Sequence, residues 1–210
     1  MLALVLSAVP VIHYPFGWFE TLFHELSHGL AALLTGGKLL AIELGFDGSG
    51  YCFTSGGNQV LILISGYAGS SLWGVLVFIS GSSTKAYNST IAMLVPASVI
   101  ALVTVLWARD VVTLVILITM FILLVMAYRF VGLGVIRYIV QFSGVYVVLN
   151  SIRSSLSLVD GKSVGDGSAL AEITHIPELI WVVVWCFVAV ICLLYLYRRA
   201  HSGGTLVSLP

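Results

Sequence analysis

The sequence predicts an all-α polytopic membrane protein with about six transmembrane helices and a small β-hairpin after the first. Composition is the first observation behind this prediction: of 210 residues, 60% are hydrophobic and only 9% are charged. Soluble domains carry about 25% charged residues, so this chain cannot cover a water-facing surface in the usual way. The second observation is a mean hydropathy of +1.10. The third is a series of apolar stretches close to the roughly 20 residues that span a bilayer as a helix.

Six apolar stretches account for most of the chain, and each is expected to cross the membrane as a helix. Pro15 suits the start of the first stretch, because proline lacks only an N–H group that would be unpaired there. Arg109 and Asp110 divide a longer apolar region into two stretches. The expected spans are residues 16–34, 59–79, 91–108, 111–128, 133–149 and 177–197.

Two polar stretches interrupt these spans. The first, residues 35–58, contains two short runs of β-branched and aromatic residues around a Gly-rich turn, which predicts a β-hairpin. The second, residues 150–176, is rich in Ser and Gly and is expected to be a polar loop. Because an even number of expected spans separates the two stretches, both should lie on the same side of the membrane. We expect residues 1–210 to form one integral membrane domain.

Charge and cysteine content exclude several other classes of protein. Nine Lys and Arg residues balance nine Asp and Glu residues, so there is no basic face and no nucleic-acid partner is expected. The three cysteines form no CxxC pair, which argues against a thiolate zinc site. The composition predicts that the protein lies in a lipid bilayer. The sequence specifies neither an oligomeric state nor which membrane holds the protein.

The first expected span contains the motif His24-Glu25-Leu26-Ser27-His28. On an α-helix, residues four apart lie about 6 Å apart along the axis and about 40° apart around it, so the two histidines face the same way. Two imidazoles at this spacing can bind one metal ion, and Zn²⁺ is the metal that suits them best. Glu25 lies beside them without being a ligand. It is therefore the candidate catalytic base, which moves protons to and from a water molecule.

A catalytic zinc site usually has three protein ligands, so a third is expected from outside this motif. Asp166 and Asp160, both in the second polar stretch, are the candidates. Asp166 stands between two glycines, which let the backbone approach closely, and its carboxylate would offset the charge of the ion. Asp160 precedes Gly161 and equally suits an ordinary turn. We take Asp166 as the third ligand and keep Asp160 as the alternative.

Small residues occur along the second expected span, among them Gly66, Gly69 and Gly74. Such residues let helices pack closely in a membrane, and this is the interpretation that we favour. A path for water to the metal site is the alternative.

Residues 23–37, together with 56–57 and 65–70, resemble the site-2 protease family of intramembrane zinc metalloproteases. The likeness is closest to the smaller, peptidase M50B-like branch of that family. Asp166 and the residues that follow it as far as Trp185 are similar to the second signature of this branch. In the main branch an Asn/Pro-rich stretch leads to a Leu-Asp-Gly signature. This chain lacks that stretch and has only Val-Asp-Gly at residues 159–161, so Asp160 stays an alternative.

The resemblance implies hydrolysis of a peptide bond within or beside the bilayer, in a membrane protein or peptide substrate. It also implies that His24, His28 and Asp166 are zinc ligands and that Glu25 is the catalytic base. A helical substrate must unwind locally before attack. The hairpin then either holds the substrate as an added strand or is a simple connecting loop, and the sequence leaves both interpretations open. The alternative is a non-catalytic membrane protein of the same fold that keeps the metal. A transporter fits less well, because the ionisable residues concentrate in one helix and one loop.

Overall fold

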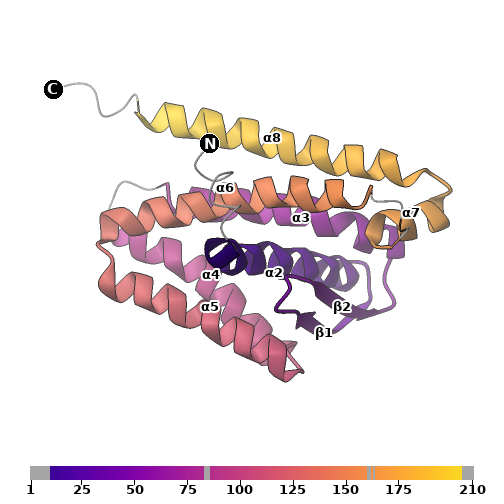
Figure 1. Ribbon diagram of the computed structural model, residues 1–210, viewed down its shortest axis with the longest axis horizontal. Helices are drawn as coiled ribbons and strands as arrows, with labels where there is room; N and C mark the ends of the chain where they lie inside the picture. Colours follow the sequence, from indigo (N-terminus) through magenta and orange to yellow (C-terminus); the bar gives the residue numbers. More distant parts are fainter. Residues whose placement is uncertain (1–9, 83–85, 160–161, 163, 205–210) are drawn as a thin grey trace.

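The computed structural model describes residues 10–82, 86–159, 162 and 164–204, arranged as shown in Figure 1. Within these residues, the helices and the two-stranded sheet follow the order that the sequence predicts. The elements are α2 (Pro10–Leu34), β1 (Lys38–Leu44), β2 (Gly50–Ser55), α3 (Gln59–Ser80), α4 (Ala86–Leu106), α5 (Val111–Phe130), α6 (Leu133–Ser157), α7 (Asp166–Thr174) and α8 (Glu178–Gly204).

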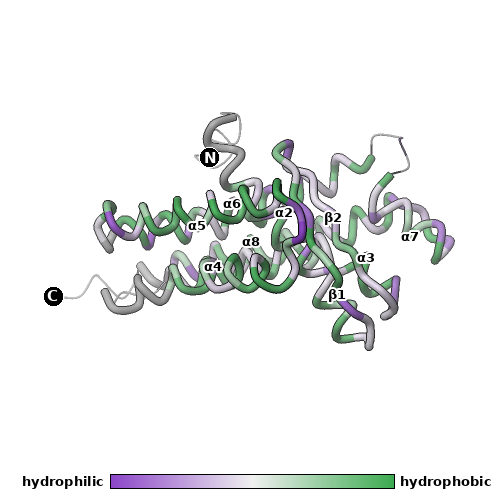
Figure 2. The backbone as a smooth tube through the Cα atoms, turned by 90° about the horizontal axis from the view of Figure 1, so that it is seen from below, coloured by the Kyte–Doolittle hydropathy of each residue, from purple (hydrophilic) through white to green (hydrophobic). Residues whose placement is uncertain are grey.

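Four helices, α3, α5, α6 and α8, are long and apolar enough to cross a membrane. The protein is therefore an integral, multi-pass membrane protein, as the sequence predicts. Helices also occupy the first and third expected spans. The part of α4 whose side chains the structure describes, Ala92–Leu106, is apolar but shorter than a full span, and α2 carries the polar residues of the His-Glu motif. Hydrophobic residues dominate α4 and α5 in Figure 2, whereas hydrophilic segments lie mainly near the hairpin and α7.

Helix α2 lies at the centre of the molecule and contacts α3, α6 and both strands (Figure 1). The outer helix α8 packs against α3 and α6, and the α4–α5 pair lies on the opposite side. The main hydrophobic core joins α2 and β1 to α4, α5 and α6. Among its residues with no exposed surface are Leu22 of α2, Ile42 of β1 and Ile116 of α5. The hairpin is thus part of the core and is held firmly beside α2.

Helix α2 ends in a glycine turn that reverses the chain. Gly36 has a φ of 84°, a left-handed conformation that glycine adopts without strain. The N–H of Gly36 donates to Leu33 O (3.3 Å), and the N–H of Gly37 donates to Ala32 O (2.8 Å). This pattern is the Schellman motif, which satisfies the last carbonyl groups of a helix. The Gly36-Gly37 pair therefore sets the point at which the hairpin leaves α2.

The strands β1 and β2 pair antiparallel, with Leu44 opposite Gly50, so the predicted hairpin is confirmed. The outer edge of β1 is hydrogen-bonded to the connection between α4 and α5 and to the first turn of α5. The N–H of Ile42 donates to Trp107 O (3.0 Å), and the N–H of Leu44 donates to Thr113 Oγ1 (2.7 Å). Within the described residues the sheet has two strands only, so no strand pairs with the outer edge of β2.

The polar stretch 150–176 is more helical than the sequence predicts. Helix α6 continues to Ser157, and the Ser151 hydroxyl donates to Tyr67 O on α3 (2.9 Å). A further short helix, α7, begins at Asp166. The preceding Gly165 has a φ of 113°, which favours glycine. Asp160, the alternative third ligand, lies outside the described residues.

Candidate metal centre

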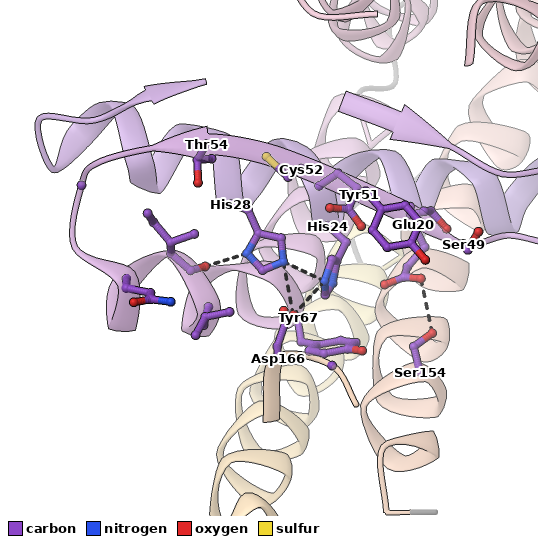
Figure 3. Close-up of a pocket in the computed structure, with 18 of the residues that line it drawn as sticks. Glu20, His24, His28, Ser49, Tyr51, Cys52, Thr54, Tyr67, Ser154 and Asp166 are labelled. Atoms are coloured by element: carbon purple, nitrogen blue, oxygen red, sulfur yellow. Dashed lines mark hydrogen bonds and ion pairs between the residues drawn. The ribbon is translucent and has the colours of Figure 1, made fainter. Parts of the chain in front are cut away.

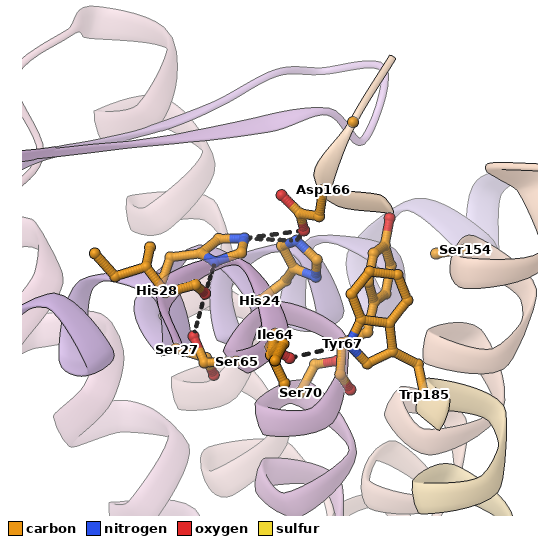
Figure 4. Close-up of polar contacts among 12 residues, drawn as sticks. His24, Ser27, His28, Ile64, Ser65, Tyr67, Ser70, Ser154, Asp166 and Trp185 are labelled. Carbon is orange, nitrogen blue, oxygen red and sulfur yellow. Dashed lines mark hydrogen bonds and ion pairs between the residues drawn. The ribbon is translucent and has the colours of Figure 1, made fainter. Parts of the chain in front are cut away.

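Three potential ligand atoms meet beside α2, as Figures 3 and 4 show. Asp166 Oδ2 lies 3.0 Å from His24 Nε2 and 3.2 Å from His28 Nε2, and the two Nε2 atoms are 3.0 Å apart. Within the part of the chain that the structure describes, these side chains form the one group of three or more that could hold a metal ion. The helical spacing brings the histidines together, and the packing of α7 against α3 brings the aspartate to them.

The size of this triangle fits a zinc ion. In a tetrahedral site with zinc–ligand distances of about 2.0–2.1 Å, the ligand atoms lie about 3.3 Å apart. The separations of 3.0, 3.0 and 3.2 Å are close to that value. Two imidazole nitrogens and one carboxylate oxygen are also a donor set that catalytic zinc sites use. The residues present therefore suit the metal that the sequence predicts.

Helix α3 positions both imidazole rings. Since a carbonyl group can only accept, the 2.6 Å contact between His28 Nδ1 and Ile62 O requires the proton on Nδ1. That tautomer leaves the Nε2 lone pair of His28 free for a metal. The His24 ring meets the Tyr67 ring edge to face, with centroids 4.3 Å apart. Gly66 lies against both histidines, because a Cβ atom there would be 2.6 Å from each Cε1 atom.

Asp166 carries a negative charge in this setting. Burial raises the pKa of Asp166, but hydrogen bonds from His24 and His28 outweigh burial and hold it well below its usual value. Asp166 is also the first residue of α7, where the unpaired N–H groups of the first helical turn favour an anion. The ionised carboxylate is the form that binds a metal.

Glu25 lies outside the triangle but lines the same cavity. It is 6% exposed, and its carboxylate faces β2 at Gly50. A Cβ atom on Gly50 would lie 2.7 Å from Glu25 Oε1, so the missing side chain leaves room for the carboxylate. The cavity has a volume of about 720 Å³ and is bounded by α2, the hairpin turn and β2, the first turns of α3, Ser154 of α6 and the start of α7. Its size lies within the range of about 300–1,000 Å³ that is usual for ligand sites.

Two further residues of the cavity, Glu20 and Tyr67, were not predicted from the sequence. Glu20 precedes His24 by four residues, which is about one helical turn. This spacing is the same as that between the two histidines, and it could have identified Glu20 as a residue on the same face of the helix. Tyr67 had no such signal, because its place beside His24 depends on how α3 packs against α2.

Comparison with known proteins agrees with this geometry. The chain matches the family model described as Peptidase M50B-like over residues 1–196. It belongs to the Peptidase M50B-like family. Neither a curated protein nor a solved structure matches the chain significantly.

Membership in the M50B-like family confirms the resemblance that the motif predicts. It indicates a membrane protein of peptidase type, and M50 proteins are zinc metalloproteases. Among the described residues of this M50B-like chain, the group that could bind the metal is His24, His28 and Asp166.

Proposed function

We propose that this protein is a zinc-dependent intramembrane endopeptidase, which hydrolyses a peptide bond in or near a transmembrane segment of a membrane protein. The main support is the convergence of His24 Nε2, His28 Nε2 and Asp166 Oδ2 within 3.2 Å of one another, with Glu25 in the same cavity. Burying a carboxylate that binds no metal is costly, and a purely structural site does not need one. Glu25 thus favours catalysis over the alternative, a non-catalytic metal-binding protein.

The mechanism follows from the positions of these side chains. His24, His28 and Asp166 would hold the ion through two neutral imidazoles and one carboxylate. Zinc bound there would polarise the scissile carbonyl group and make water easier to deprotonate. Glu25 accepts a proton from the attacking water and later donates it to the leaving amine, so it ends in its starting state.

The free edge of β2 supports a way to bind the substrate. The outer edge of β1 is already occupied through Ile42 and Leu44, whereas β2 lines the cavity. An unwound segment of the substrate can pair with β2 as an added strand, which brings its carbonyl groups past the metal ligands. This can be tested with peptide substrates that are N-methylated at one amide at a time near the scissile bond. Methylation of every second amide should lower kcat/KM, because alternate N–H groups of an added strand point toward β2. An equal effect at every position would contradict strand addition.

The test of the proposal compares the wild-type protein with Glu25→Gln and Asp166→Ala. Each protein is purified in detergent, its zinc content is measured by elemental analysis, and cleavage of a transmembrane peptide is followed. Glu25→Gln should keep zinc and lose cleavage by a factor of about 10²–10⁴, the usual contribution of a general base. Asp166→Ala should lose most of the zinc. Glu172→Gln, at an exposed position on α7, is the matched control and should change neither quantity.

The remaining outcomes separate the alternatives. Zinc retained by Asp166→Ala but lost by Asp160→Ala would assign the third ligand to Asp160. A wild-type protein that binds zinc but cleaves no transmembrane peptide would support the non-catalytic alternative. A wild-type protein that binds no zinc would refute the proposal.

A further inference from the structure

Glu20 is a buried carboxylate that the proposed mechanism does not use. It lies on α2 and lines the cavity, with 4% of its surface exposed. Its Oε2 atom accepts hydrogen bonds from Asn150 Nδ2 (3.1 Å) and Ser154 Oγ (3.4 Å), both on α6. Its Oε1 atom is buried and has no hydrogen-bond partner among the described residues.

A buried carboxylate oxygen without a partner is destabilising, so a donor for Oε1 is expected. No lysine or arginine forms an ion pair with Glu20 within residues 10–82, 86–159, 162 and 164–204. Since Glu20 lines the cavity, a rotation of its side chain can bring this carboxylate to a donor of a bound molecule.

The charges around the cavity indicate what kind of donor this is. Three carboxylates line it, those of Glu20, Glu25 and Asp166, and no lysine or arginine is among its lining residues. Carboxylates without a lysine or arginine beside them in the cavity favour a cationic group of a bound molecule over a neutral one. An ammonium or guanidinium group also forms a charge-assisted hydrogen bond with a carboxylate, which is stronger than a neutral hydrogen bond.

The position of Glu20 indicates which part of a substrate it meets. In Figure 3, Glu20 and Ser154 lie at one end of the cavity, and Thr54 lies at the other end beyond His28. Glu20 is four residues before His24, which corresponds to about 6 Å along the helix. An extended peptide advances about 3.3 Å per residue, so this distance corresponds to about two residues of a substrate strand.

We infer that Glu20 is a specificity-determining residue, which binds the lysine or arginine side chain of a substrate about one to three residues from the scissile bond. The inference rests on the proposed function. It also agrees with the place of the cavity beside the hairpin and α7, where the hydrophilic segments of the molecule gather (Figure 2). Lysine and arginine are common next to transmembrane segments, where a substrate helix leaves the apolar core.

The kinetic test scans one residue at a time through a cleaved transmembrane peptide, over three positions on each side of the scissile bond. Each position carries Lys, Met of similar length, or Glu. In wild-type protein, one position on one side should favour Lys over Met in kcat/KM by a factor of about 10–100, the usual effect of a hydrogen bond to a charged group. In Glu20→Gln this ratio should fall to near 1. Glu172→Gln is the matched control and should keep the ratio.

A binding measurement separates this inference from catalysis. Zinc-loaded Glu25→Gln protein, which is expected to bind without cleaving, is titrated with the Lys and Met peptides. The Lys peptide should bind more tightly by a similar factor of about 10–100, and adding Glu20→Gln should remove the difference. If Glu20→Gln does not fold, Glu20→Asp keeps the charge and should keep the preference for a cation.

The outcomes are distinguishable. Lys preference in binding without cleavage of any peptide would overturn the proposed function and support the role of Glu20. Cleavage with the same Lys-to-Met ratio in wild-type and Glu20→Gln protein would overturn the role of Glu20 alone. An equal loss of activity on all peptides in Glu20→Gln would show that Glu20 only stabilises the contact between α2 and α6, which also overturns the inference.

Discussion

Replacement of Gly66 by alanine should remove metal binding while leaving the fold intact. Gly66 lies on α3 against the two metal-binding imidazoles. A Cβ atom there would lie 2.6 Å from Cε1 of His24, 2.6 Å from Cε1 of His28 and 2.7 Å from His24 Nε2. Carbon atoms in contact are normally about 3.5–4.0 Å apart, so both rings must retreat by about 1 Å.

A displacement of this size exceeds what a zinc site tolerates. Ligand distances in such sites vary by about 0.2 Å, so a shift of about 1 Å takes both nitrogens out of range. The two rings cannot easily shift together to form the site elsewhere, because His28 Nδ1 is hydrogen-bonded to Ile62 O at 2.6 Å and the Tyr67 ring packs on His24. Changes behind metal ligands commonly reduce affinity by about 10–100-fold, equivalent to about 1.4–2.8 kcal/mol, and Gly66→Ala should reach or exceed the upper value.

The fold should survive, because the clash involves the ends of two side chains rather than backbone. Alanine is also a better helix former than glycine by about 0.5–1 kcal/mol. The assay equilibrates purified protein with buffered free zinc and measures zinc per chain, and then measures the melting temperature with a chelator present. Gly132→Ala is the matched control, since a Cβ atom there meets nothing within 4 Å. Wild-type zinc affinity in a folded Gly66→Ala protein would refute the reasoning about this contact.

Three smaller perturbations test other parts of the structure. Gly50→Ala places a methyl group 2.7 Å from Glu25 Oε1, so the rate of cleavage should fall at least about tenfold while the zinc content stays unchanged. A loss of zinc that parallels the loss of cleavage would contradict this prediction. Burial raises the pKa of Cys52 to about 12, so iodoacetamide should modify this thiol slowly up to about pH 9, whereas the unfolded thiol, with a pKa of about 8.5, reacts readily. Mass spectrometry of the peptide that contains Cys52 measures this modification. Because the pKa of Cys52 is higher in the folded than in the unfolded protein, its contribution to stability is present below about pH 8.5 and declines as the pH rises toward 12. Asp110 caps α5 by accepting a hydrogen bond from the N–H of Thr113 (2.8 Å), so Asp110→Ala should reduce stability by about 1 kcal/mol in a thermal melt without affecting zinc.

Much of the fold could be predicted because the relevant signals are local. Each apolar stretch is nearly long enough to span a bilayer, and each forms a long helix whose ends lie within eight residues of the expected ones. The Gly-rich turn between two short apolar runs became the hairpin. The common direction of His24 and His28 also follows from helix geometry alone. These features depend on residues close together in the chain, so they are readable without knowledge of the packing.

The rest of the candidate site depends on contacts between distant segments. Asp166 is 142 residues from His24, and only the packing of α7 on α3 brings them to 3.0 Å. The sequence could narrow the third ligand to two aspartates of one polar stretch, but the short helix that carries Asp166 had no apolar periodicity strong enough to predict it. Glu20 was overlooked for a different reason: its carboxylate precedes the motif, and its burial depends on Asn150 of α6.

The glycines of α3 show how one sequence pattern serves two physical purposes. Their spacing predicts close helix packing, and at Gly74 this is confirmed, because a Cβ atom there would lie 2.7 Å from Gly144 O on α6. At Gly66 the neighbours are imidazole rings instead. Gly74→Ala should therefore force two backbones apart and lower the melting temperature, with zinc lost only as the protein unfolds. Gly66→Ala should show the opposite behaviour: the protein loses zinc, but the melting temperature of the metal-free protein is unchanged. If both variants lose zinc and stability together, α3 does not separate packing from metal binding, and the assignment of Gly66 to the metal centre fails.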